Sequence, residues 1–195
     1  MRWLARTCAA ETYYLAMTRR VFVDTEWTSL PWSGQAELMW VGLADEDGRS
    51  WSAISADVDI DPLTNDFIAG VWKYISPDDP RSTSSEIAAG VMEFCGDIDE
   101  FWAWIPTMES FAEWFDLGSD APDIYARYWD WDLQMLRSLV DPWPEGWPDS
   151  LHDLNAAAVE AGVEIPPRRA NHLAPDVHAV WNRELFELIL QSRQG

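Results

Sequence analysis

The amino-acid sequence predicts an α/β domain in which helices flank a mixed central β-sheet. Two observations lead to this prediction. Residues 21–58 contain three short segments rich in β-branched and aromatic residues, which are typical of strands. Residues 84–191 contain segments in which apolar residues recur at helical spacing. A chain of 195 residues has room for one sizeable core, so we expect a single domain.

Three strands are expected in succession near the start of the chain. The turn Glu46-Asp47-Gly48 lies between the second and third, and Gly at the end of such a turn favours a hairpin connection. We therefore expect the three strands to form a meander. Their sequences are VFVDTEW at 21–27, AELMWVGLAD at 36–45 and SWSAISADV at 50–58.

Helices are expected from residue 84 onward. In the segment 84–95, Ile87, Val91 and Phe94 recur at helical spacing, Ser84 or Ser85 can cap the start, and Gly96 marks the end. Residues 109–115 read as an inserted helix. The remaining expected elements are a strand from 123 to about 129, a helix from about 132 to 140, a Pro-rich loop at 141–150, and two final helices at about 149–161 and 175–191.

The composition restricts the classes of protein without excluding a nuclease. The chain has 34 acidic and 13 basic residues, and its formal charge of −21 repels a polyanion at long range. Nucleases that use divalent ions nevertheless gather carboxylates and let the metal ions contact the phosphate. Cys8 and Cys95 form no CxxC pair, so we expect reduced thiols. No apolar run reaches the roughly 18 residues that span a bilayer, and we expect a cytoplasmic protein with no membrane partner.

Two carboxylates follow the most apolar of the expected strands. Asp24 and Glu26 come directly after Val21-Phe22-Val23, and their spacing of two places both side chains on one face of the sheet. Two carboxylates that are desolvated together repel each other unless cations lie between them. The alternative is a pair of exposed acids at a strand end. Because α/β proteins place their sites at the ends of central strands, the pair indicates a metal site.

Three segments resemble the motifs of one enzyme family in the required order. The segment VFVDTEW resembles the first motif of the DnaQ-like (DEDD) 3′-5′ exonuclease superfamily, an apolar strand followed by D-x-E. PDIYARYWDWDLQML resembles the second, with Leu136 four positions after Asp132. NHLAPDVHAVWNRELFELI resembles the third, H-x-A-x-x-D, although His172 and Asp176 are four apart instead of five. Over about residues 20–190 the chain is most similar to RNase AS-type 3′-5′ exoribonucleases, because it shares the D-T-E start and the Pro-Pro-Arg segment.

The resemblance implies a ribonuclease H-like fold and 3′-5′ exonuclease activity on the 3′ end of single-stranded RNA or DNA, with RNA preferred. It also allows for a homodimer. The general base would be His172, and Asp24 would bridge two Mg²⁺ or Mn²⁺ ions. The four implied metal ligands are Asp24, Glu26, Asp132 and Asp176. The implied substrate-binding residues are Trp27, which would stack on a base, and Arg168 and Arg169, which would contact phosphate.

The sequence leaves alternatives open at two motifs and for the function. Asp130 or Glu109 could replace Asp132 as the second-motif ligand. His178 could replace His172 as the base. If Pro175 opens the final helix, however, His178 lies about 200° around the helix from Asp176 and points away from the metal ions. For the function, the alternatives are a catalytically inactive protein of this fold that binds other proteins, and an acidic protein that mimics nucleic acid.

Residues 1–17 show no clear periodicity and contain no motif, so we expect an N-terminal extension followed by an exonuclease domain at 18–195. Deleting residues 1–17 should leave the melting temperature and the hydrolysis of a single-stranded substrate unchanged. Thermal unfolding and a nuclease assay, each run beside the full chain, check this expectation. A truncated protein that fails to fold would show that these residues are part of the core.

Overall fold

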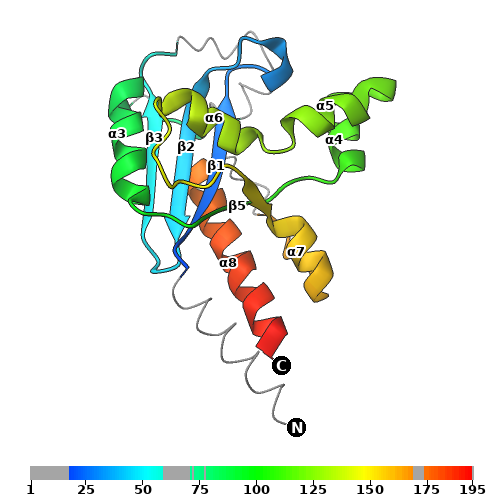
Figure 1. Cartoon of the computed structure of the whole chain (residues 1–195). Helices are drawn as coiled ribbons and strands as arrows, with labels where there is room; N and C mark the ends of the chain where they lie inside the picture. Colours follow the sequence, from blue (N-terminus) through cyan, green and yellow to red (C-terminus); the bar gives the residue numbers. More distant parts are fainter. Residues whose placement is uncertain (1–17, 59–70, 72, 77, 169–173, 195) are drawn as a thin grey trace.

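A computed structural model describes residues 18–58, 71, 73–76, 78–168 and 174–194 of the chain. Within them, a six-stranded sheet with the strand order β4-β3-β2-β1-β5-β6 forms the centre, and helices cover both of its faces (Figure 1). The strands are β1 (Arg20–Trp27), β2 (Leu38–Asp45), β3 (Ser50–Ser55), β4 (Arg81–Ser82), β5 (Glu100–Ala103) and β6 (Leu151–Asp153).

The sheet is mixed, as the sequence predicts. Strands β1, β2 and β3 form the expected antiparallel meander, whereas β5 runs parallel to β1, β6 parallel to β5, and β4 parallel to β3. Strand β1 has a neighbour on each side and is buried along its whole length. It is therefore the central strand that its apolar run indicates. The short strands β4, β5 and β6 were not predicted, because two to four residues are too few to show an alternating pattern.

Within the described residues, the α-helices with defined bounds lie between residues 84 and 194. Helix α3 has the predicted bounds, but its N-cap is Thr83, whose side chain accepts a hydrogen bond from the backbone N–H of Glu86 in a capping box. None of the described helices combines the length and apolarity of a membrane span. The helices are α3 (Ser84–Cys95), α4 (Met108–Phe115), α5 (Ala121–Tyr128), α6 (Trp131–Leu139), α7 (Leu154–Ala161) and α8 (Pro175–Gln194), with 3-10 turns η1 (Pro31–Ser33) and η2 (Gly118–Asp120).

Two predicted elements differ from the structure. The strand expected at 123–129 is helix α5. Its aromatic residues suggested a strand, but Tyr125 and Tyr128 lie three apart, at helical spacing. Tyr125 contacts Phe111 of α4, and Tyr128 contacts Trp32. The helix expected at 149–161 begins as strand β6, and α7 starts only at Leu154. In both segments, tertiary contacts override the local preference.

The two faces of the sheet carry separate cores because side chains alternate along each strand. Val21 and Val23 of β1 belong to the core that packs against α3 and α6. Phe22 faces the opposite side and contacts Phe186 of α8, with 5.4 Å between the ring centroids. The same alternation directs Asp24 and Glu26 toward α8, and Thr25 toward α6. In Figure 1, α3 and α6 lie in front of the sheet and α8 lies behind it.

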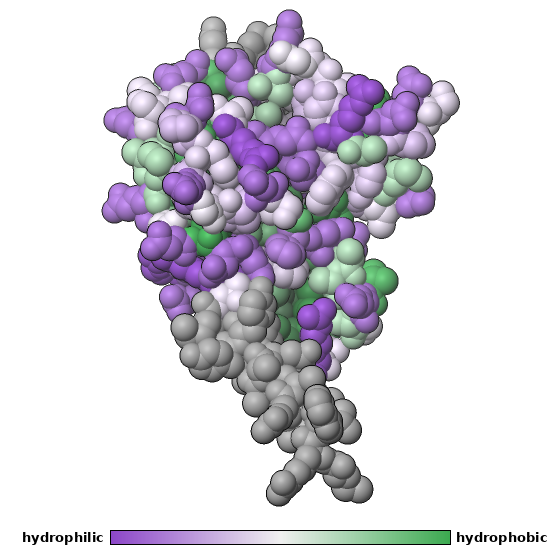
Figure 2. Space-filling model, in the orientation of Figure 1, coloured by the Kyte–Doolittle hydropathy of each residue, from purple (hydrophilic) through white to green (hydrophobic). Residues whose placement is uncertain are grey.

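The face of the molecule drawn in Figure 2 is mainly hydrophilic. Figure 2 shows hydrophilic residues over most of one face, with apolar residues in smaller areas between them. This distribution fits a chain whose formal charge is −21. The exposed large apolar side chains among the described residues are Met92, Met108, Trp114, Val159 and Leu188.

Helix α8 starts directly against the central sheet at Gly42. A Cβ atom on Gly42 would collide with backbone atoms of Pro175 and Asp176, so only glycine permits this approach. Gly42 pairs with Asp24 across β1 and β2, and the first turn of α8 therefore lies beside the acidic end of β1.

We expect Gly42→Ala to lower the free energy of unfolding by about 1–3 kcal/mol or more, because backbone must move to admit the new methyl group. Denaturant unfolding measures this loss. Gly90→Ala in α3 is the comparison variant: its Cβ would meet the indole ring of Trp51 instead of backbone, so the two variants compare a clash with a side chain and a clash with backbone. Wild-type stability of Gly42→Ala would contradict the close approach of α8.

Candidate metal centre

The end of β1 carries three buried polar side chains. Asp24, Thr25 and Glu26 are 9%, 5% and 6% exposed. The parallel strand β5 ends beside them, and α/β sheets place their sites outside the carboxyl ends of such strands. The D-x-E pair therefore lies in the protein interior, which excludes the alternative of two exposed strand-end acids.

A pocket of about 300 Å³ lies over the end of β1. Its charged and titratable lining residues are Asp24, Glu26, Asp132, Arg168 and His178. Its aromatic lining residues are Trp27, Trp104, Trp114, Phe115 and Trp131.

Asp132, in the first turn of α6, reaches the pocket as the second motif predicts. Its Oδ1 atom accepts hydrogen bonds from the backbone N–H of Thr25 at 2.9 Å and from the Thr25 hydroxyl at 2.6 Å. Burial, with the nearby charge of Asp24, raises the pKa of Asp132 to about 8. The two alternatives lie outside the pocket lining: Glu109 is exposed, and Asp130 accepts a hydrogen bond from the Gln134 side chain.

His178 lies in the pocket, and the expectation that it points away is wrong. The side chain is 5% exposed, and its Nδ1 atom is 3.3 Å from Oδ2 of Asp24. Pro175 does open α8, as predicted, but the contact at Gly42 sets which side of the helix faces the sheet. Four residues after His178, Asn182 donates a hydrogen bond to the carbonyl of Val23, which confirms that this side of α8 faces β1.

Asp176 is not among the residues that line the pocket. It is half-buried in the first turn of α8, and its Oδ1 atom has no hydrogen-bond partner among the described residues. The predicted base His172 and the predicted phosphate contact Arg169 lie outside the described residues. Their roles stay predictions.

Arg168 is the positive partner of the acidic cluster. One guanidinium nitrogen lies 2.7 Å from Oδ1 of Asp24, and the guanidinium carbon lies 4.7 Å from the ring centroid of Trp104. This charge lowers the pKa of Glu26 and of Asp132, but burial outweighs it in both groups. The sequence indicated Arg168 as a phosphate contact, whereas the structure pairs it with Asp24.

Glu26 shows the combined effect of burial and of charge repulsion in the cluster. Burial raises its pKa well above the ordinary value, and the charges of Asp24 and Asp132 raise it further. Ligand atoms of Asp24, Glu26 and His178 all lie within 4.8 Å of one another. Carboxylate oxygens with one imidazole nitrogen form a suitable donor set for a divalent cation, whose charge would offset this repulsion.

The sequence identified Trp27 as the best candidate to stack on a base, but it did not assign most of the aromatic wall of the pocket. Trp104 directly follows β5 and stacks on Trp114 of α4, with 5.8 Å between centroids, and Trp114 is 56% exposed. Trp131 contacts Trp27 at 4.8 Å. The dense Trp content of 102–114 was a signal, but it did not say which rings face the site.

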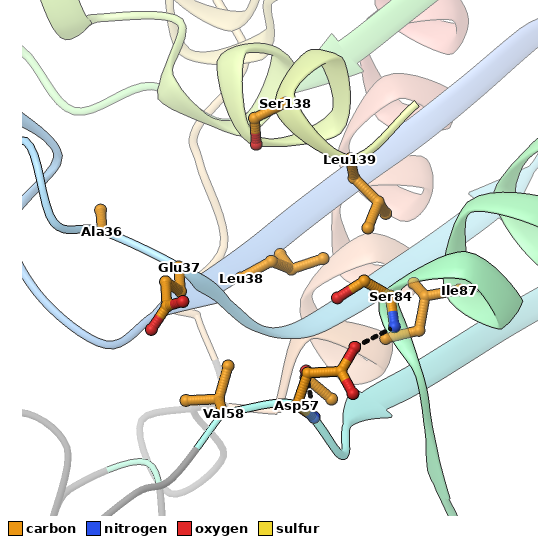
Figure 3. A pocket seen from close by; sticks show the side chains of 10 residues that line it. Ala36, Glu37, Leu38, Asp57, Val58, Ser84, Ile87, Ser138 and Leu139 are labelled. Atoms are coloured by element: carbon orange, nitrogen blue, oxygen red, sulfur yellow. Dashed lines mark hydrogen bonds between the residues drawn. The ribbon is translucent and has the colours of Figure 1, made fainter. Parts of the chain in front are cut away.

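A second pocket, of about 230 Å³, lies between the start of α3 and the end of α6 (Figure 3). Its residue Asp57 accepts a hydrogen bond from the backbone N–H of Ser84 at 2.6 Å, which holds the pKa of Asp57 below its usual range. Asp57 thus stabilises the start of α3. Among the described residues, the only cluster of possible metal ligands is the one at the end of β1.

Comparison with known proteins supports the fold. No protein-family model and no curated protein sequence matches the chain. The chain is similar to the X-ray structure of the RNase domain of the yeast Pop2 protein, with a TM-score of 0.50 and 12% sequence identity over 98% of this chain and 83% of that one. The fold is therefore ribonuclease H-like, as predicted. At this identity the similarity shows the fold alone.

We expect Glu26→Gln to stabilise the metal-free protein at about pH 8. The pKa of Glu26 is raised in the folded state. The Glu26 side chain therefore contributes to the free energy of unfolding below about pH 4.3, the ordinary pKa of the carboxyl group. This contribution is lost as pH rises from there through the folded-state pKa. Gln stays neutral. The melting temperature in EDTA should therefore exceed the wild-type value by a few degrees at about pH 8, and by less at about pH 5.

Glu109→Gln is the control for this experiment, because Glu109 is exposed and its replacement should change the melting temperature little at either pH. A Glu26→Gln protein that melts below the wild type at about pH 8 would contradict the cost of burying this charge within the cluster.

Proposed function

We propose that this protein is a metal-dependent 3′-5′ exonuclease that hydrolyses the terminal phosphodiester of single-stranded nucleic acid, with RNA preferred over DNA. The proposal rests mainly on the buried cluster of Asp24, Glu26, Asp132 and His178 at the end of the central strand. The ribonuclease H-like fold and the sequence resemblance to RNase AS-type exoribonucleases support it.

The three carboxylates of the cluster and one residue of the third motif have parts in the proposed reaction. Asp24 and Glu26 would hold Mg²⁺ or Mn²⁺, and when bound, these cations supply Lewis-acid chemistry at the phosphate. Asp132 adds a third carboxylate, held beside β1 by its two hydrogen bonds from Thr25. From its sequence motif, His172 would take the proton from the attacking water.

The remaining pocket residues suit a nucleotide at the 3′ end of a strand. The exposed ring of Trp114, stacked on Trp104, offers a surface for an unpaired base, and such stacking contributes about 1–3 kcal/mol per base. Arg168 carries a positive charge in the lining of the pocket and would contact the substrate phosphate. The acidic surface disfavours long-range attraction of nucleic acid, so binding would depend on these local contacts.

One observation favours the catalytically inactive alternative. Arg168 forms an ion pair with Asp24, and a fixed cation at this position can balance the carboxylate without any metal ion. In that case the chain would use the fold to bind another protein. The alternative requires that Mn²⁺ neither binds the cluster nor supports cleavage.

In Mn²⁺ or Mg²⁺ we expect the protein to shorten 5′-labelled single-stranded RNA from its 3′ end, and to shorten DNA more slowly. In EDTA it should cut neither. Asp24→Asn should abolish cleavage and keep the fold, because it removes a metal-binding charge and keeps the shape of the side chain. Product ladders on denaturing gels measure the reaction.

Asp130→Asn is the matched control, since Asp130 lies outside the pocket lining and should retain wild-type cleavage. Wild-type activity in Asp24→Asn would remove this residue from the mechanism. Absence of cleavage by the wild type in every metal would favour the inactive alternative.

A further inference from the structure

Helix α8 supplies an imidazole where the sequence motif predicts a carboxylate. Asp176, the expected ligand, does not line the pocket. His178, two residues later, is buried there with Nδ1 directed at Asp24. Among the described residues, His178 is the histidine that shares a cluster with the two acids of β1.

We propose that His178 is a metal ligand, and that two carboxylates and one imidazole make this site favour Mn²⁺ over Mg²⁺. The inference rests on the metal site of the proposed function but not on its reaction. Mg²⁺ binds oxygen ligands and retains its waters, whereas heavier first-row ions accept imidazole nitrogen more readily.

The spacing of the ligand atoms fits one shared cation. Atoms about 2.0–2.2 Å from one metal ion lie about 3–3.5 Å apart at the usual coordination angles. Nδ1 of His178 and Oδ2 of Asp24 are 3.3 Å apart. The ligand atoms of Glu26 and of these two residues lie within 4.8 Å of one another, so small side-chain movements suffice to close the set around an ion.

Asp24 can bind a cation beside His178 without losing Arg168. Arg168 contacts Oδ1 of Asp24, whereas His178 contacts Oδ2. The two oxygens therefore face different partners. The arginine and a metal ion can be bound by the same carboxylate, and the ion pair with Arg168 does not by itself block the site.

The backbone of α8 holds the imidazole in this position. One turn after His178, fully buried Asn182 donates a hydrogen bond to the carbonyl of Val23, the residue before Asp24. At the helix start, the contact with Gly42 fixes the first turn against β2. A ligand whose orientation is set by packing loses little freedom on binding, and this raises metal affinity.

Pulsed electron paramagnetic resonance of bound Mn²⁺ tests the assignment directly, because a coordinated imidazole gives a ¹⁴N modulation that carboxylates do not. The chain has three histidines, so each can be removed in turn. We expect the modulation in the wild type, in His152→Ala and in His172→Ala, and its loss in His178→Ala and His178→Asp. His152 is exposed and stacks on Trp102, away from the pocket lining.

Calorimetric titration gives the second readout. His178→Asp should lower the ratio of Mn²⁺ to Mg²⁺ affinity by about tenfold or more. Loss of a residue that only hydrogen-bonds to a metal ligand already costs about tenfold in metal affinity, and loss of the ligand itself should cost at least as much. His152→Ala should leave the ratio unchanged.

Mn²⁺ bound without ¹⁴N modulation in the wild type would overturn the inference and leave the proposed exonuclease standing. So would modulation that disappears in His172→Ala and persists in His178→Ala. Modulation from His178 in a protein that cuts no nucleic acid would sustain the inference and overturn the proposed function. Failure to bind Mn²⁺ at all would overturn both.

Discussion

Mutual repulsion of the carboxylates at the end of β1 is the constraint on which the site depends. Three acidic side chains, Asp24, Glu26 and Asp132, are buried within one pocket, and burial of charge without compensation is costly. The chain offsets part of this cost with Arg168 on Asp24 and with hydrogen bonds from Thr25 to Asp132. The raised pKa of Glu26 shows that the offset is incomplete. A structure that retains such a cluster is suited to bind a cation.

The fold brings this cluster together by simple strand geometry. Alternation along β1 sends Asp24 and Glu26 toward α8, and Thr25 toward α6. Helix α6 then delivers Asp132 from one side of the sheet, and α8 delivers His178 from the other. Residues more than 100 positions apart in the chain thus meet at one end of β1. The parallel strand β5 ends nearby, and the aromatic residues that follow it lie beside the cluster.

The sequence allowed part of this arrangement to be predicted. The apolar strand with D-x-E, and Asp132 before Leu136, are local patterns, and the structure brings both into the pocket. The position of His178 could not be predicted, because the phase of α8 against the sheet depends on its contact with Gly42, which lies 133 or more residues away in the chain. Strand β6 has three residues and no local signature, and α5 was misassigned because its aromatic residues also suit a strand.

The most direct test of the metal centre is anomalous diffraction from crystals of the protein soaked in Mn²⁺. We expect an anomalous peak in the pocket, in contact with Asp24, Glu26 and the Nδ1 atom of His178. A pocket with no peak under saturating Mn²⁺, and with Arg168 still paired with Asp24, would contradict this expectation. The protein's own charges would then balance the carboxylates, and the site would have no metal-dependent role.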